Sequence, residues 1–135
     1  MREDSPVDYG IRERVVIFDA GFEAILAVVL LFGAAFGQLD EDQYAAPASN
    51  IVLGLFGLAL FGFALALAVI VSRGAVTDTV LRGLAAVNAA FAALLLVWVL
   101  VARGFHTAGS AVVWTTIVAL VLLALMQVQA AGLRR

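Results

Sequence analysis

Four long apolar runs dominate the chain, at residues 18–39, 50–71, 83–102 and 111–130. Each is close to the ~20 residues that cross a ~30 Å hydrocarbon core as an α-helix. Backbone polar groups have no water partners in lipid, so a spanning run must be helical. The runs also lack the polar–apolar alternation of membrane barrel strands. The sequence therefore predicts an all-α integral membrane protein.

The connections between the runs are short, so successive helices should be antiparallel. We expect a four-helix up-down-up-down bundle over residues 15–135, preceded by a polar tail at residues 1–14. The first run is longer than the ~7–15-residue core of a signal peptide, so we expect no cleaved leader.

The composition favours a membrane protein as well. Hydrophobic residues make up 64% of the chain and charged residues only 13%, whereas soluble domains are about half apolar and a quarter charged. The chain has no cysteine, and all eight basic residues are arginine. Disulfides, thiolate metal sites and lysine nucleophiles are therefore excluded. The net charge of −2 argues against a nucleic-acid partner.

The arginines predict the orientation, because cytoplasmic segments are enriched in basic residues. Seven of the eight arginines lie in the N-terminal tail, near the middle connection or at the C-terminus, and these segments share one side of the membrane because two crossings separate each from the next. Arg103 alone falls on the other side, with Asp40, Glu41 and Asp42. We therefore expect both termini in the cytoplasm, with Tyr44, Trp98 and Trp114 at the outer interface. The seven are Arg2, Arg12, Arg14, Arg73, Arg82, Arg134 and Arg135.

Five polar residues fall at a similar depth, in the predicted cytoplasmic third of the bundle. Asp19 and Glu23 are four residues apart, on one face of the first helix. Arg82 and Asn88 belong to the third helix, and Gln127 lies near the inner end of the fourth. Ionisable groups at depth usually face the bundle interior and find partners.

Three interpretations of this cluster remain open. It could form an inward-facing polar pocket that binds a ligand head group or relays a proton. Alternatively, Asp19 or Glu23 could pair with Arg82 while Asn88 bonds across helices, so that the cluster only fixes the packing. In a third interpretation Asp19 is a hydrated interfacial residue.

Glycines predict a close contact between the first two helices. Gly33 and Gly37 lie at the outer end of the first helix, and Gly54 and Gly57 lie at matching depth in the second. Small residues let helix backbones approach closely in membranes. We expect an intramolecular contact here, with a homodimer contact as the alternative. Ala85, Ala89 and Ala93 predict a second buried strip of small residues, on the third helix.

No catalytic constellation is present, and none of the common metal, nucleophile or phosphate-loop motifs occurs. His106 is the single histidine, so one chain cannot build a histidine zinc site or a bis-histidine haem site. We expect no enzyme activity, no cofactor and no metal.

Two segments, LRGLAAVNAAFAALLLVWVL and HTAGSAVVWTTIVALVLLALMQVQAAGLRR, resemble a diffuse group of small bacterial four-span proteins of unknown function. Ala108 stands where that group has a proline. The resemblance implies a bacterial cytoplasmic (inner) membrane protein and no particular activity. The matching residues are Arg82, Asn88, Thr107, Gly109, Gln127 and residues 133–135.

The function expected from the sequence is a non-enzymatic accessory, interaction or structural membrane subunit. The alternative is a small transporter, or a protein that binds a lipid or small molecule in a cytoplasmic-side pocket around Glu23 and Asn88. The partners expected are membrane lipids, and a second copy of the chain or a larger membrane complex.

Overall fold

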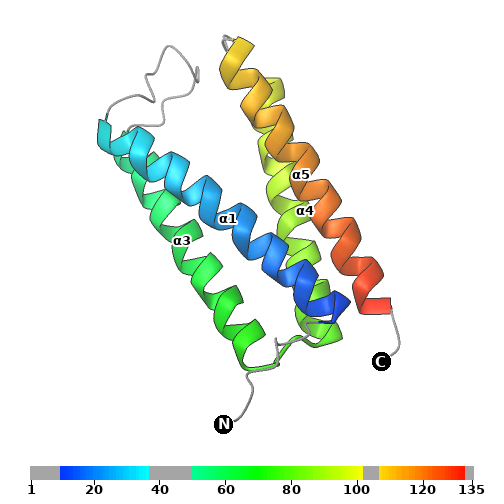
Figure 1. Ribbon diagram of the computed structural model, residues 1–135. Coiled ribbons are helices and arrows are strands. Elements are labelled where there is room, and N and C mark those ends of the chain that lie inside the picture. Colours follow the sequence, from blue (N-terminus) through cyan, green and yellow to red (C-terminus); the bar gives the residue numbers. More distant parts are fainter. Residues whose placement is uncertain (1–9, 37–49, 102–106, 133–135) are drawn as a thin grey trace.

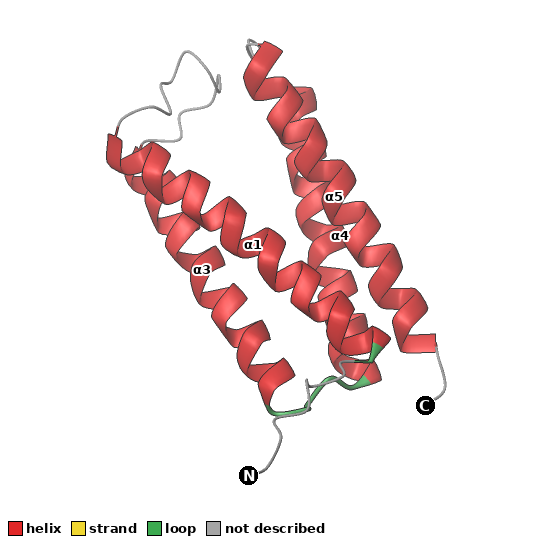
Figure 2. Ribbon diagram, in the orientation of Figure 1, coloured by secondary structure: helices red, strands yellow, loops and turns green. Residues whose placement is uncertain are grey.

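The computed structural model describes residues 10–36, 50–101 and 107–132, and nearly all of them are helical. Figure 2 shows helices joined, in the described part of the chain, by one loop at residues 73–77. The helices are α1 (Ile11–Phe36), α3 (Asn50–Ser72), α4 (Asp78–Val101) and α5 (Thr107–Gly132).

Three of the helices begin earlier than the apolar runs do, whereas α3 begins at Asn50, as its run does. α1 starts at Ile11 rather than at residue 18, so it includes residues 11–14, which we assigned to the tail. α4 starts at Asp78 rather than at residue 83. Hydrophobicity marks where lipid begins, whereas capping groups decide where a helix begins.

Side-chain and backbone caps fix the turn between α3 and α4. The Val80 amide donates to Thr77 Oγ1 at 3.2 Å, a helix N-cap. At the end of α3, Gly74 has a φ of +61°, its amide donates to the Val71 carbonyl at 2.9 Å, and the Ala75 amide donates to the Ile70 carbonyl at 3.0 Å. This paired geometry is a Schellman C-cap, which needs a left-handed residue and therefore favours glycine.

All four helices are long and apolar enough to cross a membrane, with 23 to 25 residues in each candidate span. Large apolar side chains cover their outer faces; Phe18 is 69% exposed and Leu94 is 66% exposed. Such a surface would aggregate in water but matches a lipid environment. The fold therefore supports a multi-pass membrane protein.

The helices form two pairs. α1 packs along α3 and α4 packs along α5, while the contact between the pairs is smaller and involves mainly α1 and α5. Figure 1 shows the two pairs close together at the end where α1 begins and further apart at the opposite end.

The buried apolar side chains form two clusters that reflect the arrangement of the helix pairs. One hydrophobic cluster, which includes Val16, Leu67, Leu81 and Ala130, draws on all four helices at the end where the pairs meet. Val76, in the turn between α3 and α4, is fully buried in the same cluster. A second cluster is formed by buried residues of α4 and α5 alone.

α1 and α3 approach closely at the glycines of α3. A Cβ on Gly57 would lie 3.0 Å from Leu31 Cγ and 3.2 Å from the Ala27 carbonyl oxygen, and a Cβ on Gly54 would lie 3.5 Å from Ala34 Cβ. The contact on the α1 side thus differs from the glycine pair that we predicted. Gly33 is six residues from Ala27, which rotates it about 120° around the helix, and Gly37 is outside the described residues.

Gly57→Leu should destabilise the protein by about 1–3 kcal/mol, because a side chain there must separate two packed backbones. Gly62→Leu is the matched control on the same helix, since a Cβ at Gly62 meets nothing within 4 Å. Unfolding in mixed micelles by increasing denaturing detergent measures both variants. Equal stabilities for the two variants would show that the close approach contributes nothing.

Candidate functional site

Three polar side chains form a closed ring of hydrogen bonds inside the bundle. Asn88 Nδ2 donates to Asp19 Oδ1 at 3.2 Å and to Gln127 Oε1 at 3.2 Å. Gln127 Nε2 completes the ring by donating to Asp19 Oδ2 at 2.7 Å. Asp19 and Gln127 have no solvent exposure, and Asn88 is 1% exposed. Each carboxylate oxygen of Asp19 therefore has a donor.

The ring joins the two helix pairs, since Asp19 belongs to α1, Asn88 to α4 and Gln127 to α5. A second polar contact joins the pairs near the helix ends, where Arg12 Nη1 lies 2.5 Å from Asp78 Oδ1. Asp78 is half exposed, so this ion pair contributes less than the buried ring.

Arg82 is not part of the ring, contrary to our prediction that it would lie in the cluster. It is exposed and borders a surface groove between α4 and α5, which Ala89 and Ala93 also line. Those two alanines are exposed as well, although we expected them to be buried with Ala85. Six residues separate Arg82 from Asn88, so the two side chains lie about 120° apart around α4.

Glu23 is the fourth buried polar side chain, 5% exposed and one helical turn from Asp19. Its Oε2 atom is buried and has no hydrogen-bond partner among the described residues. Asn88 and Gln127, which we expected nearby, direct their amide groups to Asp19 and to each other. Burying an unpaired carboxylate is costly, so this residue requires an explanation.

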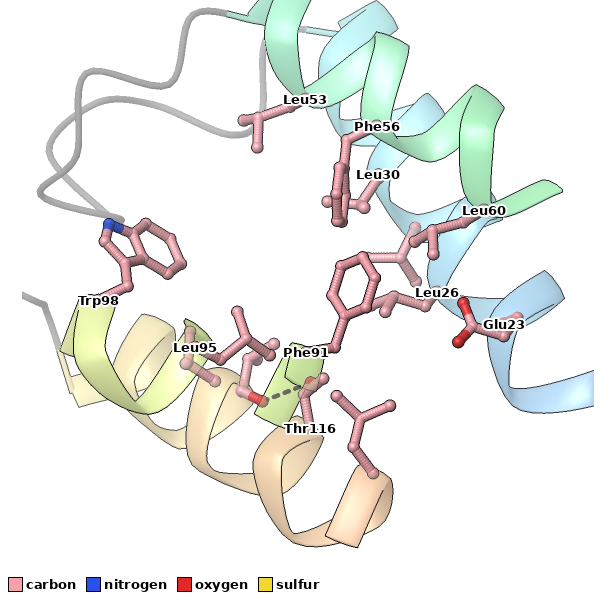
Figure 3. Close-up of a pocket in the computed structure, with 14 residues that line it drawn as sticks. Glu23, Leu26, Leu30, Leu53, Phe56, Leu60, Phe91, Leu95, Trp98 and Thr116 are labelled. Carbon is pink, nitrogen blue, oxygen red and sulfur yellow. Dashed lines mark hydrogen bonds between the residues drawn. The ribbon is translucent and has the colours of Figure 1, made fainter. Parts of the chain in front are cut away.

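Glu23 lines a cavity of about 160 Å³ between the two helix pairs. All four helices contribute to the walls, which are almost entirely apolar and include Leu26, Phe56, Leu60 and Phe91. In Figure 3 the Glu23 carboxylate lies at one end of the group of lining side chains and Trp98 at the other. Thr116 also lines the cavity, but its hydroxyl donates to the Val112 carbonyl of its own helix at 2.9 Å.

The cavity extends in the opposite direction from the pocket that we predicted. We expected a polar pocket around Glu23 and Asn88, towards the end where α1 begins, but that space is filled by the ring. The cavity instead runs from Glu23 towards Trp98. The Phe56 and Phe91 rings, from α3 and α4, meet at this cavity with centroids 5.6 Å apart.

Trp98 was predicted at the outer interface, and sequence reasoning missed it as a cavity residue. Trp114, by contrast, is 43% exposed. Tyr44 and His106 lie outside the described residues, as do Arg2, Asp40, Glu41, Asp42, Arg103, Arg134 and Arg135. Within the part of the chain that the structure describes, no group of three acidic or histidine side chains could hold a metal ion.

Comparison of the chain with protein families, with curated proteins and with solved structures found no match.

Gln127→Leu should destabilise the protein by about 1–2 kcal/mol, because it leaves Asp19 Oδ2 without a donor and Asn88 Nδ2 with one acceptor fewer. Gln129→Leu is the matched control: Gln129 is two residues further along α5 and is exposed. Both variants are compared with the wild type by unfolding in mixed micelles. If Gln127→Leu were as stable as Gln129→Leu, the ring would have no structural role.

Proposed function

We propose that this protein binds a small, largely apolar molecule within the membrane, in the cavity between its two helix pairs. The observation that carries the proposal is Glu23, which lines that cavity and whose buried Oε2 has no hydrogen-bond partner among the described residues. Apolar pockets with a few convergent polar groups are typical of small-molecule sites. Intramembrane ionisable residues are, in general, candidates for function.

A purely structural or accessory subunit, our first expectation from the sequence, requires intramembrane polar groups that pair with one another. The ring of Asp19, Asn88 and Gln127 meets that requirement. Glu23 does not, because nothing in the described part of the chain bonds its Oε2. We therefore assign packing to the ring and ligand binding to Glu23, with no enzyme activity.

We further propose that the bundle is up-down-up-down in the cytoplasmic membrane of a bacterium, with both termini in the cytoplasm. The support is the distribution of arginines, seven of which fall on the side assigned to the cytoplasm. In this orientation Trp98 lies towards the outer end of the cavity and Glu23 lies deeper.

Filling the cavity should prevent binding. Thr116→Phe places a ring in the cavity, whereas Thr115→Phe adds the same ring at an exposed position. Both threonines donate a hydrogen bond to the carbonyl four residues earlier, so the two variants lose equivalent contacts. Mass spectrometry of small molecules extracted from purified protein should detect a species with wild type and Thr115→Phe that is depleted with Thr116→Phe. Identical extracts from all three proteins would refute cavity binding.

The orientation is tested with topology reporters. A phosphatase that is active only in the periplasm should be inactive when fused after residue 135 and active when inserted within residues 37–49. A fluorescent protein that matures only in the cytoplasm should give the reverse pattern. Phosphatase activity of the terminal fusion would reverse the orientation.

A further inference from the structure

The chemistry of the cavity also specifies the charge of its ligand. Resting on the function proposed above, we propose that the ligand is a free amphipathic amine, whose protonated nitrogen donates a hydrogen bond to Glu23 while its apolar body extends towards Trp98.

The chemistry of a carboxyl group limits what can bind Glu23. In its ionised form Glu23 accepts hydrogen bonds and donates none, so a donor, and a cation most strongly, would stabilise that form at this buried position. No residue that the structure describes supplies one: Glu23 forms no salt bridge to any of them, and Arg82 faces the groove between α4 and α5. An ammonium group provides both the donor and the charge.

A neighbouring acid limits the charge of the ligand as well. Asp19 lies one turn from Glu23 on the same face of α1, and its two oxygens already accept bonds from Asn88 and Gln127. Asn88 and Gln127 are neutral amides, so the ring brings no positive charge to this region. Two carboxyl groups therefore disfavour an anionic ligand and favour a cationic one.

A water molecule satisfies this site poorly. Buried waters generally make about three hydrogen bonds to polar groups. Here the lining offers the Glu23 carboxyl and a Thr116 hydroxyl whose hydrogen is already directed to the Val112 carbonyl. The remaining walls near Glu23 are aliphatic and aromatic, which suits a ligand with an apolar body.

The size of the cavity selects a small molecule rather than a whole lipid. The cavity of about 160 Å³ is comparable with apolar cavities of ~150 Å³ that hold a single benzene ring. Two turns of α4, or about 10 Å, separate Phe91 from Trp98, enough for a ring with a short alkyl amine.

Trp98 provides a direct readout, because it lines the cavity and a bromine atom in contact with it quenches its fluorescence. Trp114→Phe removes the other tryptophan and leaves Trp98 as the single reporter. The probes are 4-bromophenethylamine and the matched alcohol, 2-(4-bromophenyl)ethanol, titrated into full-length protein in a mild nonionic detergent. They differ in the ammonium group alone.

We expect saturable quenching by both probes, with the amine bound at least tenfold more tightly than the alcohol. Glu23→Gln should reduce the ratio of the two affinities to about one, while the alcohol still quenches Trp98 saturably, which also shows that the variant is folded. Glu13→Gln, which removes an acid of α1 that does not line the cavity, should retain the preference for the amine.

Equal affinities for the two probes in the Trp114→Phe protein, or a preference that survives Glu23→Gln, would overturn the amine proposal and leave the binding cavity intact. If neither probe quenched Trp98 saturably, or if Thr116→Phe quenched like its parent, the proposed function itself would fail.

Discussion

The buried ring of Asp19, Asn88 and Gln127 is the interaction on which the arrangement of the two helix pairs depends. In lipid there is little hydrophobic force to bring helices together, so close packing and interhelical hydrogen bonds must do so. Within each pair the packing is extensive, but between the pairs it is smaller. The ring therefore adds hydrogen bonds to this smaller contact, at the junction of α1, α4 and α5 and beside the apolar cluster that all four helices share.

The same ring explains why Oε2 of Glu23 has no hydrogen-bond partner in the described part of the chain. Asn88 and Gln127 each donate a hydrogen bond to Asp19, and Glu23 lies one turn further along α1. Towards the far end of α1 the two pairs lie further apart (Figure 1). Separation leaves a cavity with apolar walls and one carboxylate at its end. Asp19, which belongs to the structural ring, and Glu23, the candidate binding group, thus lie four residues apart on α1 and have different roles.

Depth could be predicted from the sequence, but rotation about each helix axis could not. If successive helices run in opposite directions, the sequence places Asp19, Asn88 and Gln127 at the same depth in the membrane. It places Arg82 at that depth too. Whether a residue faces a neighbouring helix or lipid depends on rotation, and nearly uniform apolar helices such as α3 carry little signal for it. For the same reason the glycines of α3 were predicted at a contact but their partners on α1 were not, and the sequence did not indicate that Trp98 lines the cavity.

The role of the ring is tested most directly by distances between spin labels, which the absence of native cysteine makes straightforward. Labels at Leu58→Cys of α3 and Val118→Cys of α5 report the separation of the two pairs. Labels at Leu58→Cys and at Val28→Cys of α1 report the distance within one pair. All three positions are exposed. With Asp19→Ala, the distance between the pairs should lengthen and its distribution broaden, while the distance within the pair stays unchanged. An unaltered distance between α3 and α5 in that variant would contradict the claim that the ring holds the two pairs together.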